Sequence, residues 1–243
     1  MNPKSYRLSH VGDGIGQRYE QCLAKKIDAA IWEQLTRPHL KMLLAQESAA
    51  GRQHYLDFAC GTGRILEASA VHFENVSAID ISPDMLQIAR ERFKGAQFHC
   101  VDVTQQPNAV DDTFDCVTAF RFFANAEPTL RSQVAEWLSD HMAPGGALIG
   151  NTHCHPWSMT GALNTVSSQL LRRLRRTLSR DGIEKLLQPY GFTVERWDGF
   201  RILPTVVGRP PLGTQLQIQA EKMAMRASLG FFGADQIFVA RRR

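Results

Sequence analysis

The sequence predicts an α/β fold in which helices cover both faces of a mostly parallel sheet. Short apolar segments typical of buried strands alternate along the chain with segments whose apolar residues recur at helical spacing, and this alternation favours parallel strands joined by crossover helices. Three apolar segments end in or beside an aspartate, namely Asp57, Asp80 and Asp102. Because ligands bind at the carboxyl ends of the strands in such sheets, these aspartates predict a binding site at that edge.

The chain before the first strand predicts two helices. Residues 21–35 and 38–50 carry apolar side chains at intervals of three and four residues, the spacing of one buried helix face. The first strand begins near Tyr55 and runs into a loop with Gly61 and Gly63. Glycine lacks a Cβ atom, so the loop backbone can adopt positive φ and approach a ligand closely. A helix predicted over 64–72 would direct its free N–H groups at the same loop.

The following elements repeat this pattern. A strand over 76–79 ends at Asp80, and Ser82 followed by Pro83 is typical of a helix N-cap and first helical position. The remaining elements predicted in order are a helix over 83–93, strands over 97–103 and 114–121, a helix over 127–141, a strand from 147 on after the Gly145-Gly146 turn, a helix over 179–189, an αL cap at Gly191, and strands over 192–200 and 236–241.

Two kinds of cofactor use such a glycine loop. The loop of proteins that bind dinucleotides such as NAD has a third glycine, and Leu66 occupies that position here. Asp80, at the tip of the second strand, suits the hydroxyls of a ribose, which both kinds of cofactor contain. An NAD-dependent oxidoreductase therefore stays open as the alternative at this point.

The loop and its surroundings resemble the class I S-adenosylmethionine (SAM)-dependent methyltransferases. The order Asp57-Phe58-Ala59-Cys60-Gly61-Thr62-Gly63 resembles their motif I, with Ala59 where a glycine is common. Segments around Asp80, Asp102, residues 114–121 and residues 143–150 resemble four further motifs in the same order. The resemblance covers residues 52–153 and implies a Rossmann-like sandwich whose seven-stranded, mostly parallel sheet has the order 3-2-1-4-5-7-6, with the seventh strand antiparallel.

The resemblance also implies which residues bind the cofactor. Asp80 would accept from the ribose hydroxyls, Asp102 from the adenine amine, and the Phe120 carbonyl from the methionine amino group. Tyr19 either packs over the sulfonium or is a surface aromatic residue. The full expected set is Tyr19, Asp57, Ala59, Gly61, Gly63, Asp80, Ile81, Met85, Asp102, Val103, Phe120 and Arg121.

His153 and His155 are the candidate catalytic residues. They follow the fifth predicted strand, at the edge where an acceptor would bind, and one of them could act as a general base. The alternative is that proximity alone suffices, because SAM already carries a good leaving group. The run His153-Cys154-His155 invites a zinc site, but the sequence shows no second cluster to complete four ligands, so no metal is expected.

The resemblance implies a single domain over residues 1–243. Residues 1–50 would form helices over the cofactor pocket, 51–153 the SAM-binding core, and 154–178 and 201–233 insertions that build a partly apolar acceptor pocket. Five arginines between Arg172 and Arg180 form either a solvated helix face or an attraction for an acidic acceptor. A homodimer is left open.

Composition limits the class of protein. A hydrophobic fraction of 44% is typical of a globular domain, and a net charge of +4 does not indicate nucleic-acid binding. No apolar run is long enough to span a membrane, the first twelve residues lack the apolar region of a signal peptide, and five cysteines without a CxxC pair favour reduced thiols in the cytoplasm.

The sequence therefore predicts in-line methyl transfer from SAM to a small or medium organic acceptor, such as a secondary metabolite, sugar or lipid-like molecule, with S-adenosylhomocysteine as the product. The alternatives are the NAD-dependent oxidoreductase and a SAM-binding protein without transfer activity.

Overall fold

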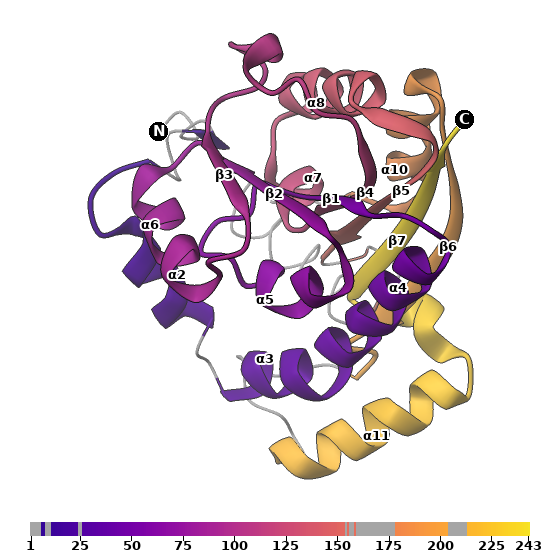
Figure 1. The fold of residues 1–243 in the computed structure, drawn as a ribbon. Helices are drawn as coiled ribbons and strands as arrows, with labels where there is room; N and C mark the ends of the chain where they lie inside the picture. Colours follow the sequence, from indigo (N-terminus) through magenta and orange to yellow (C-terminus); the bar gives the residue numbers. More distant parts are fainter. Residues whose placement is uncertain are drawn as a thin grey trace.

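The computed structural model describes residues 6–7, 11–23, 26–153, 155, 158, 178–203 and 213–243. Its strands form one twisted sheet (Figure 1). They are β1 (His54–Phe58), β2 (Asn75–Asp80), β3 (Gln97–Cys100), β4 (Phe114–Ala119), β5 (Met142–Thr152), β6 (Phe192–Phe200) and β7 (Asp235–Arg242).

The strand order in the sheet is β3-β2-β1-β4-β5-β7-β6. Strands β1 to β5 pair in parallel, and β7 runs antiparallel to both β5 and β6. The expected sheet is confirmed in order and direction. The register sets Asp57 of β1 beside Ala78 of β2 and Thr118 of β4, so this carboxyl lies in the centre of the sheet.

Helices cover both faces, as predicted. The helical segments are α2 (Ile15–Leu23), α3 (Lys26–Ile31), the π-helical turn η1 (Trp32–Thr36), α4 (Arg37–Ala49), α5 (Leu66–Ser69), α6 (Pro83–Arg92), α7 (Phe122–Asn125), α8 (Pro128–Asp140), α10 (Arg180–Leu187) and α11 (Thr214–Arg226), with short 3-10 turns η2 (Ala70–His72), η3 (Pro107–Ala109), η4 (Gln188–Tyr190) and η5 (Leu229–Phe232).

The core consists of two apolar clusters, one on each face of the sheet. Leu56 points into the cluster with α7, α8 and α10, whereas its neighbour Tyr55 points into the cluster with α3, α4, α5, α6 and α11. Figure 1 shows α8 and α10 on one side of the strands and α4, α5 and α11 on the other. Alternate residues of β1 therefore face opposite layers, as strand geometry requires.

Several element boundaries differ from those predicted. The third strand ends at Cys100 rather than 103, because Asp102 begins a turn in which its carbonyl accepts from the Gln105 and Gln106 N–H groups. The helix expected from residue 64 begins at Leu66, since Gly63 holds φ at 77°. Helix α2 begins at Ile15, six residues before the predicted start, and the expected 21–35 helix ends in the π turn η1.

The local capping signals were predicted correctly. The Ser82 hydroxyl accepts from the Met85 N–H at 3.4 Å, and Pro83 opens α6. Gly191 has φ 78° and ends η4 in the αL conformation. Helix α7 was not predicted; it follows Arg121, whose φ of 60° turns the chain sharply at the end of β4.

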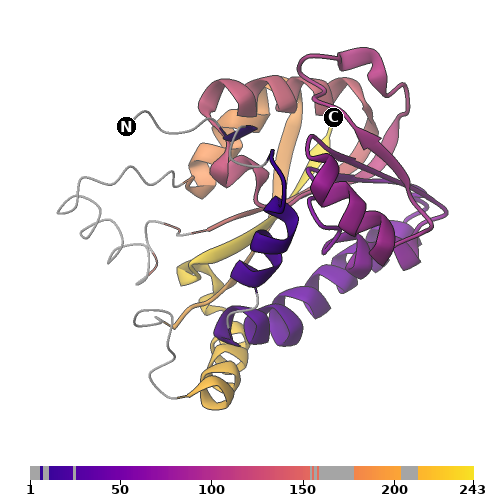
Figure 2. The same cartoon turned by 90° about the vertical axis from the view of Figure 1, so that its left-hand side faces the viewer.

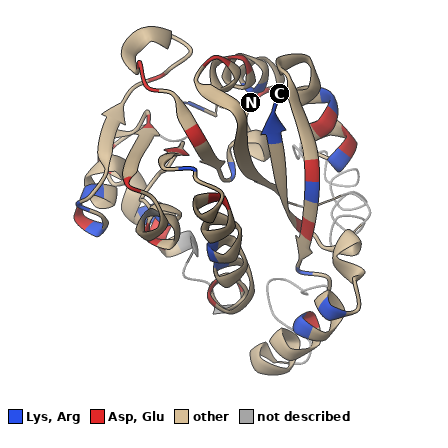
Figure 3. Cartoon of the chain, turned by 45° about the vertical axis from the view of Figure 1, so that its right-hand side comes forward, with Lys and Arg blue, Asp and Glu red and all other residues tan. Residues whose placement is uncertain are grey.

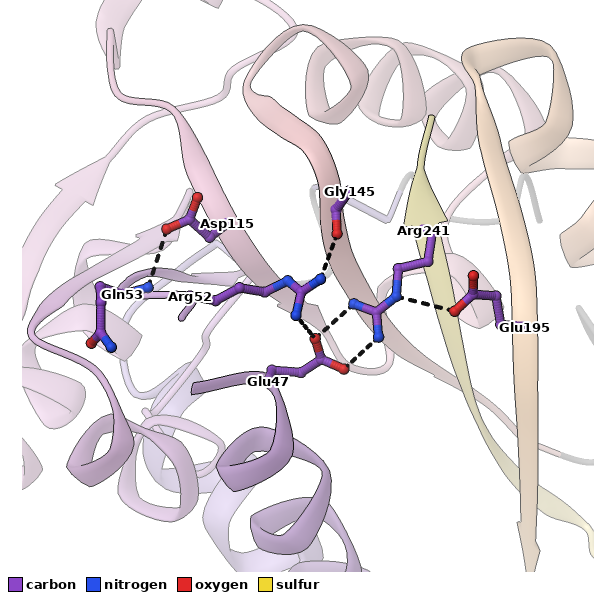
Figure 4. A network of polar contacts seen from close by, with 7 residues as sticks. All are labelled: Glu47, Arg52, Gln53, Asp115, Gly145, Glu195 and Arg241. Atoms are coloured by element: carbon purple, nitrogen blue, oxygen red, sulfur yellow. Dashed lines mark hydrogen bonds and ion pairs between the residues drawn. The ribbon is translucent and has the colours of Figure 1, made fainter. Parts of the chain in front are cut away.

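A partly buried ion network lies at the edge of the sheet where the parallel strands begin (Figure 4). Glu47 of α4 binds Arg241 of β7 through both oxygens, and its Oε2 lies 2.9 Å from Arg52 Nη1. Arg52 also donates to the Gly145 carbonyl at 2.8 Å, and Arg241 lies 3.1 Å from Glu195. The network joins α4 to β5, β6 and β7 at the edge opposite to the carboxyl ends of the parallel strands.

Charges are mixed over the surface. In the view of Figure 3, acidic and basic segments interleave along the helices and the β6–β7 edge. Among the described residues, no helix combines the length and apolar character that crossing a membrane requires.

Candidate active site

A cavity of about 490 Å³ lies at the carboxyl ends of the parallel strands, a size suited to a small ligand. Its wall combines the glycine loop, the ends of β4 to β6 and the start of β7 with side chains from α2, α3 and η1. The lining residues are Tyr19, Asp28, Ile31, Trp32, Thr36, Asp57, Ala59, Cys60, Gly61, Thr62, Arg64, Ile65, Phe120, Arg121, Asn151, His153, Phe200, Arg201, Asp235, Gln236 and Ile237.

The glycine loop takes the conformation that its sequence predicts. Ala59, Gly61 and Gly63 have φ of 54°, 55° and 77°. A Cβ atom on Gly63 would lie 3.0 Å from the Cβ and 3.1 Å from the Cα of Ala89, so α6 can pack there only against glycine. A Cβ atom on Gly61 would meet only the Met85 sulfur, at 3.5 Å. Gly61 is thus required by its φ, whereas Gly63 is required by both φ and packing.

Asp80 ties the loop to the second strand. Its Oδ2 accepts from the Gly61 N–H at 2.8 Å, and its Oδ1 accepts from the Ser82 N–H at 2.9 Å. Each carboxylate oxygen can accept a second hydrogen bond. Asp80 therefore shapes the loop at the carboxyl end of β2.

Asp57 is a buried acid among the residues that line the cavity. The side chain is 1% exposed, and its Oδ1 accepts from the Thr118 hydroxyl at 2.8 Å. The Thr118 hydroxyl in turn shares a 2.5 Å hydrogen bond with Tyr55. The Oδ2 has no hydrogen-bond partner, and burial raises the pKa of Asp57 to about 7. A cation in the cavity would satisfy this oxygen, so the residue fits the amino group of a methionine moiety.

Tyr6 and Arg7 lie at the adenosine end of the site predicted from the sequence. Arg7 Nε lies 2.7 Å from Asp102 Oδ2, and Arg7 also donates to Thr104. The Tyr6 ring meets Phe122 edge-on at 5.7 Å. Burial, and next the negative charge of Asp80, raise the pKa of the Tyr6 hydroxyl. Tyr6 and Arg7 thus lie over the tips of β2 and β3, a contact that the sequence did not suggest.

The expected cofactor residues separate into two groups. Those that line the cavity are Tyr19, Asp57, Ala59, Gly61, Phe120 and Arg121. Those that lie outside its lining, beneath the loop or toward Tyr6 and Arg7, are Gly63, Asp80, Ile81, Met85, Asp102 and Val103. Met85 is 2% exposed and packs in the interior. The cavity therefore corresponds to the part of the expected site that would bind the methionine moiety of SAM.

Helix α2 lies beside α6 (Figures 1 and 2) and brings Tyr19 to the cavity. The Asp84 carboxylate accepts from the Gly16 N–H at 2.8 Å and from the Gly14 N–H at 3.4 Å, which caps the start of α2 from a neighbouring helix. Glu20 accepts from the Thr62 hydroxyl and lies 2.5 Å from Arg92. These contacts fasten α2 to the glycine loop.

The two candidate histidines lie in different places. His153 lines the cavity, and burial is the main cause that lowers its pKa; Asp235 opposes this shift, and Arg121 and Arg201 add to it. His155 is 1% exposed and does not line the cavity. Its ring lies edge-on to Phe231 at 5.9 Å, and its N–H donates to the Ala234 carbonyl at 3.0 Å. The structure brings only His153 to the cavity.

The sequence did not single out the residues on the far wall. Arg201, at φ 57°, forms ion pairs with Asp28 at 2.5 Å and Asp235 at 3.1 Å. Trp32 comes from the π turn η1, and Arg64 directly follows the glycine loop. Only Arg64 carried a local signal, namely its place next to Gly63; the others come from distant segments that packing brings together.

Some expectations fall outside the described residues. These are the arginines from 172 to 176 and most of the expected insertion over 154–178. Of the expected insertion over 201–233, the structure describes 201–203 and 213–233. Within the described part of the chain, no group of three or more histidine, cysteine or acidic side chains is arranged to hold a metal ion.

Comparison with known proteins gives concordant results. A family model described as a methyltransferase domain matches residues 56–146. The demethylmenaquinone methyltransferase of Thermotoga maritima is 38% identical over 173 residues, which cover 57% of this chain and 73% of that protein. The dTDP-3-amino-3,4,6-trideoxy-alpha-D-glucopyranose N,N-dimethyltransferase of Streptomyces venezuelae is 32% identical over 132 residues, 51% of this chain and 52% of that protein.

Among solved structures, the magnesium protoporphyrin IX methyltransferase of Synechocystis PCC 6803 with bound SAM aligns over 98% of this chain and 95% of its own, with a TM-score of 0.63 and 15% identity. At that identity the likeness shows the fold. The chain spans 52% and 61% of the length of the first two curated relatives that it matches. All the proteins named above are methyltransferases, which gives no support to the oxidoreductase alternative. The chain belongs to the class I SAM-dependent methyltransferases.

Proposed function

We propose that this protein transfers a methyl group from SAM to a small or medium organic acceptor. The observation that carries the proposal is the cavity beside a positive-φ glycine loop, which is lined by Asp57, a buried acid whose Oδ2 has no hydrogen-bond partner. Leaving such an oxygen unpaired costs about 1–3 kcal/mol, and an ammonium group would remove that cost. The methionine part of SAM carries this ammonium group.

The remaining roles follow the geometry of the cavity. The main chain of Ala59 and Gly61 would contact the ligand directly, and the Phe120 carbonyl would accept a hydrogen bond from the methionine amino group. Asp80 would bind the ribose and Asp102 the adenine, with Ile81 beside the ring. Met85 and Val103, each 2% exposed, would support this end of the site from the interior. When bound, SAM supplies an electrophilic methyl group on a sulfonium leaving group. Much of the protein's contribution is then orientation and exclusion of water.

His153 is the proposed general base for acceptors that must lose a proton. The lowered pKa keeps its imidazole neutral near pH 7, as a base requires. Arg64, Arg121 and Arg201 also line the cavity, which supports an acidic acceptor. For the protein as a whole we propose a cytoplasmic location. A homodimer is part of the same proposal, to be tested by its mass in solution.

Calorimetry with S-adenosylhomocysteine (SAH) tests the cofactor. We expect a micromolar Kd, about 8 kcal/mol of binding free energy, and none of comparable strength for NADH. Asp57→Asn should weaken SAH binding at least tenfold. The matched control, Asp111→Asn, changes an exposed loop acid away from the cavity and should leave the affinity unchanged. NADH binding without SAH binding would refute the proposal.

Radiolabelled SAM then tests transfer, with amino sugar nucleotides, hydroquinones and carboxylic acids as separate acceptor pools. Label in one pool identifies the acceptor class. Tight SAH binding without transfer to any pool or to a broad metabolite extract would favour the SAM-binding protein without transfer activity.

A further inference from the structure

Two buried hydroxyl groups lead through the interior of the sheet to the Asp57 carboxyl. Thr118 of β4 lies beside Asp57 of β1 in the register of the sheet, and Tyr55 lies two residues before Asp57 on the same face of β1. The Thr118 hydroxyl donates to Asp57 Oδ1 at 2.8 Å, and the Tyr55 and Thr118 hydroxyl oxygens are 2.5 Å apart. None of the three residues is more than 1% exposed, so the whole chain of hydrogen bonds is shielded from solvent.

The number of protons sets the direction of this chain when Asp57 is ionised. A carboxylate only accepts hydrogen bonds, and a threonine hydroxyl has a single hydrogen to donate. Because Thr118 donates that hydrogen to Asp57, the Tyr55 hydroxyl must donate to Thr118. Burial, and next the negative charge of Asp57, raise the pKa of Tyr55, so this hydroxyl keeps the proton that it donates. Each donor polarises the next, which strengthens the hydrogen bond to Oδ1.

The Tyr55 ring is held in place for this contact. It stacks on the Phe73 ring with the two centres 4.8 Å apart and the planes 15° from parallel. A phenylalanine at the same position would fill the apolar layer equally well and would bring no polar group that needs a partner. Apolar packing therefore explains the ring of Tyr55, whereas its hydroxyl is explained by Thr118.

The charge of Asp57 depends on the hydrogen bond at the end of the chain. Burial is the main cause that raises the pKa of Asp57, to about 7, and the negative charge of Asp80 adds to the rise. The hydrogen bond from Thr118 is the largest cause in the opposite direction, and the Leu66 N–H acts with it. Near pH 7 the carboxyl is therefore balanced between its two forms, and loss of one donor would shift the balance toward the neutral form.

The other groups around the carboxyl do not replace Thr118. Burial raises the pKa of the Cys60 thiol, which therefore stays neutral near pH 7. Arg64 and Arg121 line the same cavity as Asp57, yet the hydrogen bond from Thr118 remains the largest cause that lowers the pKa of Asp57. A cation in the cavity requires the ionised carboxylate, so the two hydroxyls bear on binding although neither residue lines the cavity.

We propose that Tyr55 and Thr118 are positioning residues that hold Asp57 Oδ1 and keep the carboxyl ionised near neutral pH, which leaves Oδ2 for the ammonium group of the methionine moiety. The role of the ammonium group rests on the proposed function. The effect of the two hydroxyls on the protonation of Asp57 stands without it, and the two parts are tested separately.

The first experiment measures the protonation of Asp57 in the ligand-free protein. Carbon-13 NMR follows its carboxyl signal, identified by its absence in Asp57→Asn, from pH 5 to pH 9. Thr118→Val should raise the measured pKa by about one unit, because a hydrogen bond to the ionised form is lost. Tyr55→Phe should raise it by about half a unit, since Thr118 still donates. Thr118→Ser retains a hydroxyl and should titrate like the wild type.

The matched control is Thr152→Val. It removes another fully buried strand hydroxyl, whose oxygen has no hydrogen-bond partner in the described part of the chain, and it should leave the pKa of Asp57 unchanged. All of these substitutions keep the approximate shape of the side chain, and urea denaturation verifies that each variant is folded.

The second experiment measures SAH binding by calorimetry over the same pH range. If only the ionised carboxylate binds the ammonium group, the pKa changes above predict how the affinity depends on pH. Thr118→Val should weaken binding about tenfold at pH 6 and less than about twofold at pH 8.5, and Tyr55→Phe about threefold at pH 6. Thr118→Ser should restore the wild-type profile. A role in packing alone would weaken binding by the same factor at every pH.

Two results would overturn the proposal. One is an unchanged pKa of Asp57 in both Thr118→Val and Tyr55→Phe. The other is a loss of SAH affinity by the same factor at every pH, which would make the hydroxyls purely structural. A wild type that binds no SAH, together with variants that still shift the pKa of Asp57, would instead refute the proposed function and leave the effect of the hydroxyls on Asp57 in place.

Discussion

Glu47 and Arg241 lie 194 positions apart in the sequence and form a two-pronged ion pair, with Nη1–Oε2 at 2.6 Å and Nη2–Oε1 at 2.7 Å (Figure 4). Glu47 is only 6% exposed. The pair joins a helix near the start of the chain to its last strand, so it fastens the side of the sheet that does not bind the ligand.

Glu47→Gln should lower the free energy of unfolding by about 2 kcal/mol, because Arg241 and Arg52, both partly buried, would lose the charge-assisted hydrogen bonds to their shared counter-ion. Urea denaturation of the purified protein measures this change. The control is Glu33→Gln, which removes an ion pair to Arg37 from a 53% exposed side chain and should cost less than about 1 kcal/mol. Equal costs for the two variants would contradict the role assigned to Glu47.

Asp57→Asn should stabilise the ligand-free protein above neutral pH. Burial raises the folded-state pKa of Asp57 from 3.8 to about 7, so the unfolded state ionises first as the pH rises. The wild type therefore loses stability between these two pKa values, on the order of 4 kcal/mol in total, and the asparagine variant does not. Denaturation curves from pH 4 to 8 test this. If the free energy of unfolding changed with pH in the same way for both proteins, burial would not disfavour the ionised form of the Asp57 carboxyl.

Gly63→Ala should destabilise the fold more than Gly61→Ala. Both substitutions place a Cβ atom at positive φ, which costs about 1–2 kcal/mol. At Gly63 the new atom also presses on the Ala89 backbone, whereas at Gly61 it has ordinary contact with a flexible methionine. We expect a difference of at least 1 kcal/mol in thermal or urea unfolding. A larger loss of stability at Gly61 would refute this assignment.

Acid should destabilise the protein through His153 and His155. Burial lowers both pKa values in the folded state, so below about pH 6.5 the unfolded state takes up protons that the folded state does not. Stability then falls as the pH decreases, by up to about 1.4 kcal/mol per pH unit for each histidine. Glutamine at each position should flatten the pH dependence, and His54→Gln, at an exposed position, should not.

The parts of the site that the sequence predicted are those with a local signal. Asp57, Gly61, Gly63 and Asp80 all lie where a buried strand meets a turn, and a few neighbouring residues suffice to identify each one. The resemblance to the family added the strand order, including the antiparallel β7, which no local pattern encodes.

The parts that were not predicted depend on contacts between distant segments. The ion pair between Arg7 and Asp102 joins residues far apart in the sequence, and Trp32 enters the cavity from a π turn inside a longer helical segment. His155 and His153 looked equivalent in sequence. In the structure, the path of the chain after β5 takes one ring to the cavity and the other against Phe231.

The place of β7 in the sheet has a consequence for how the chain is made. In the described residues, β6 pairs with no strand except β7, which comprises Asp235–Arg242 and follows β6 in the sequence. During synthesis on the ribosome, residues 192–200 therefore have no strand to pair with until β7 has been made. Until then, β5 also presents an open edge. A chain that stops at residue 234 would lose two strands rather than one, and its exposed edge would favour aggregation.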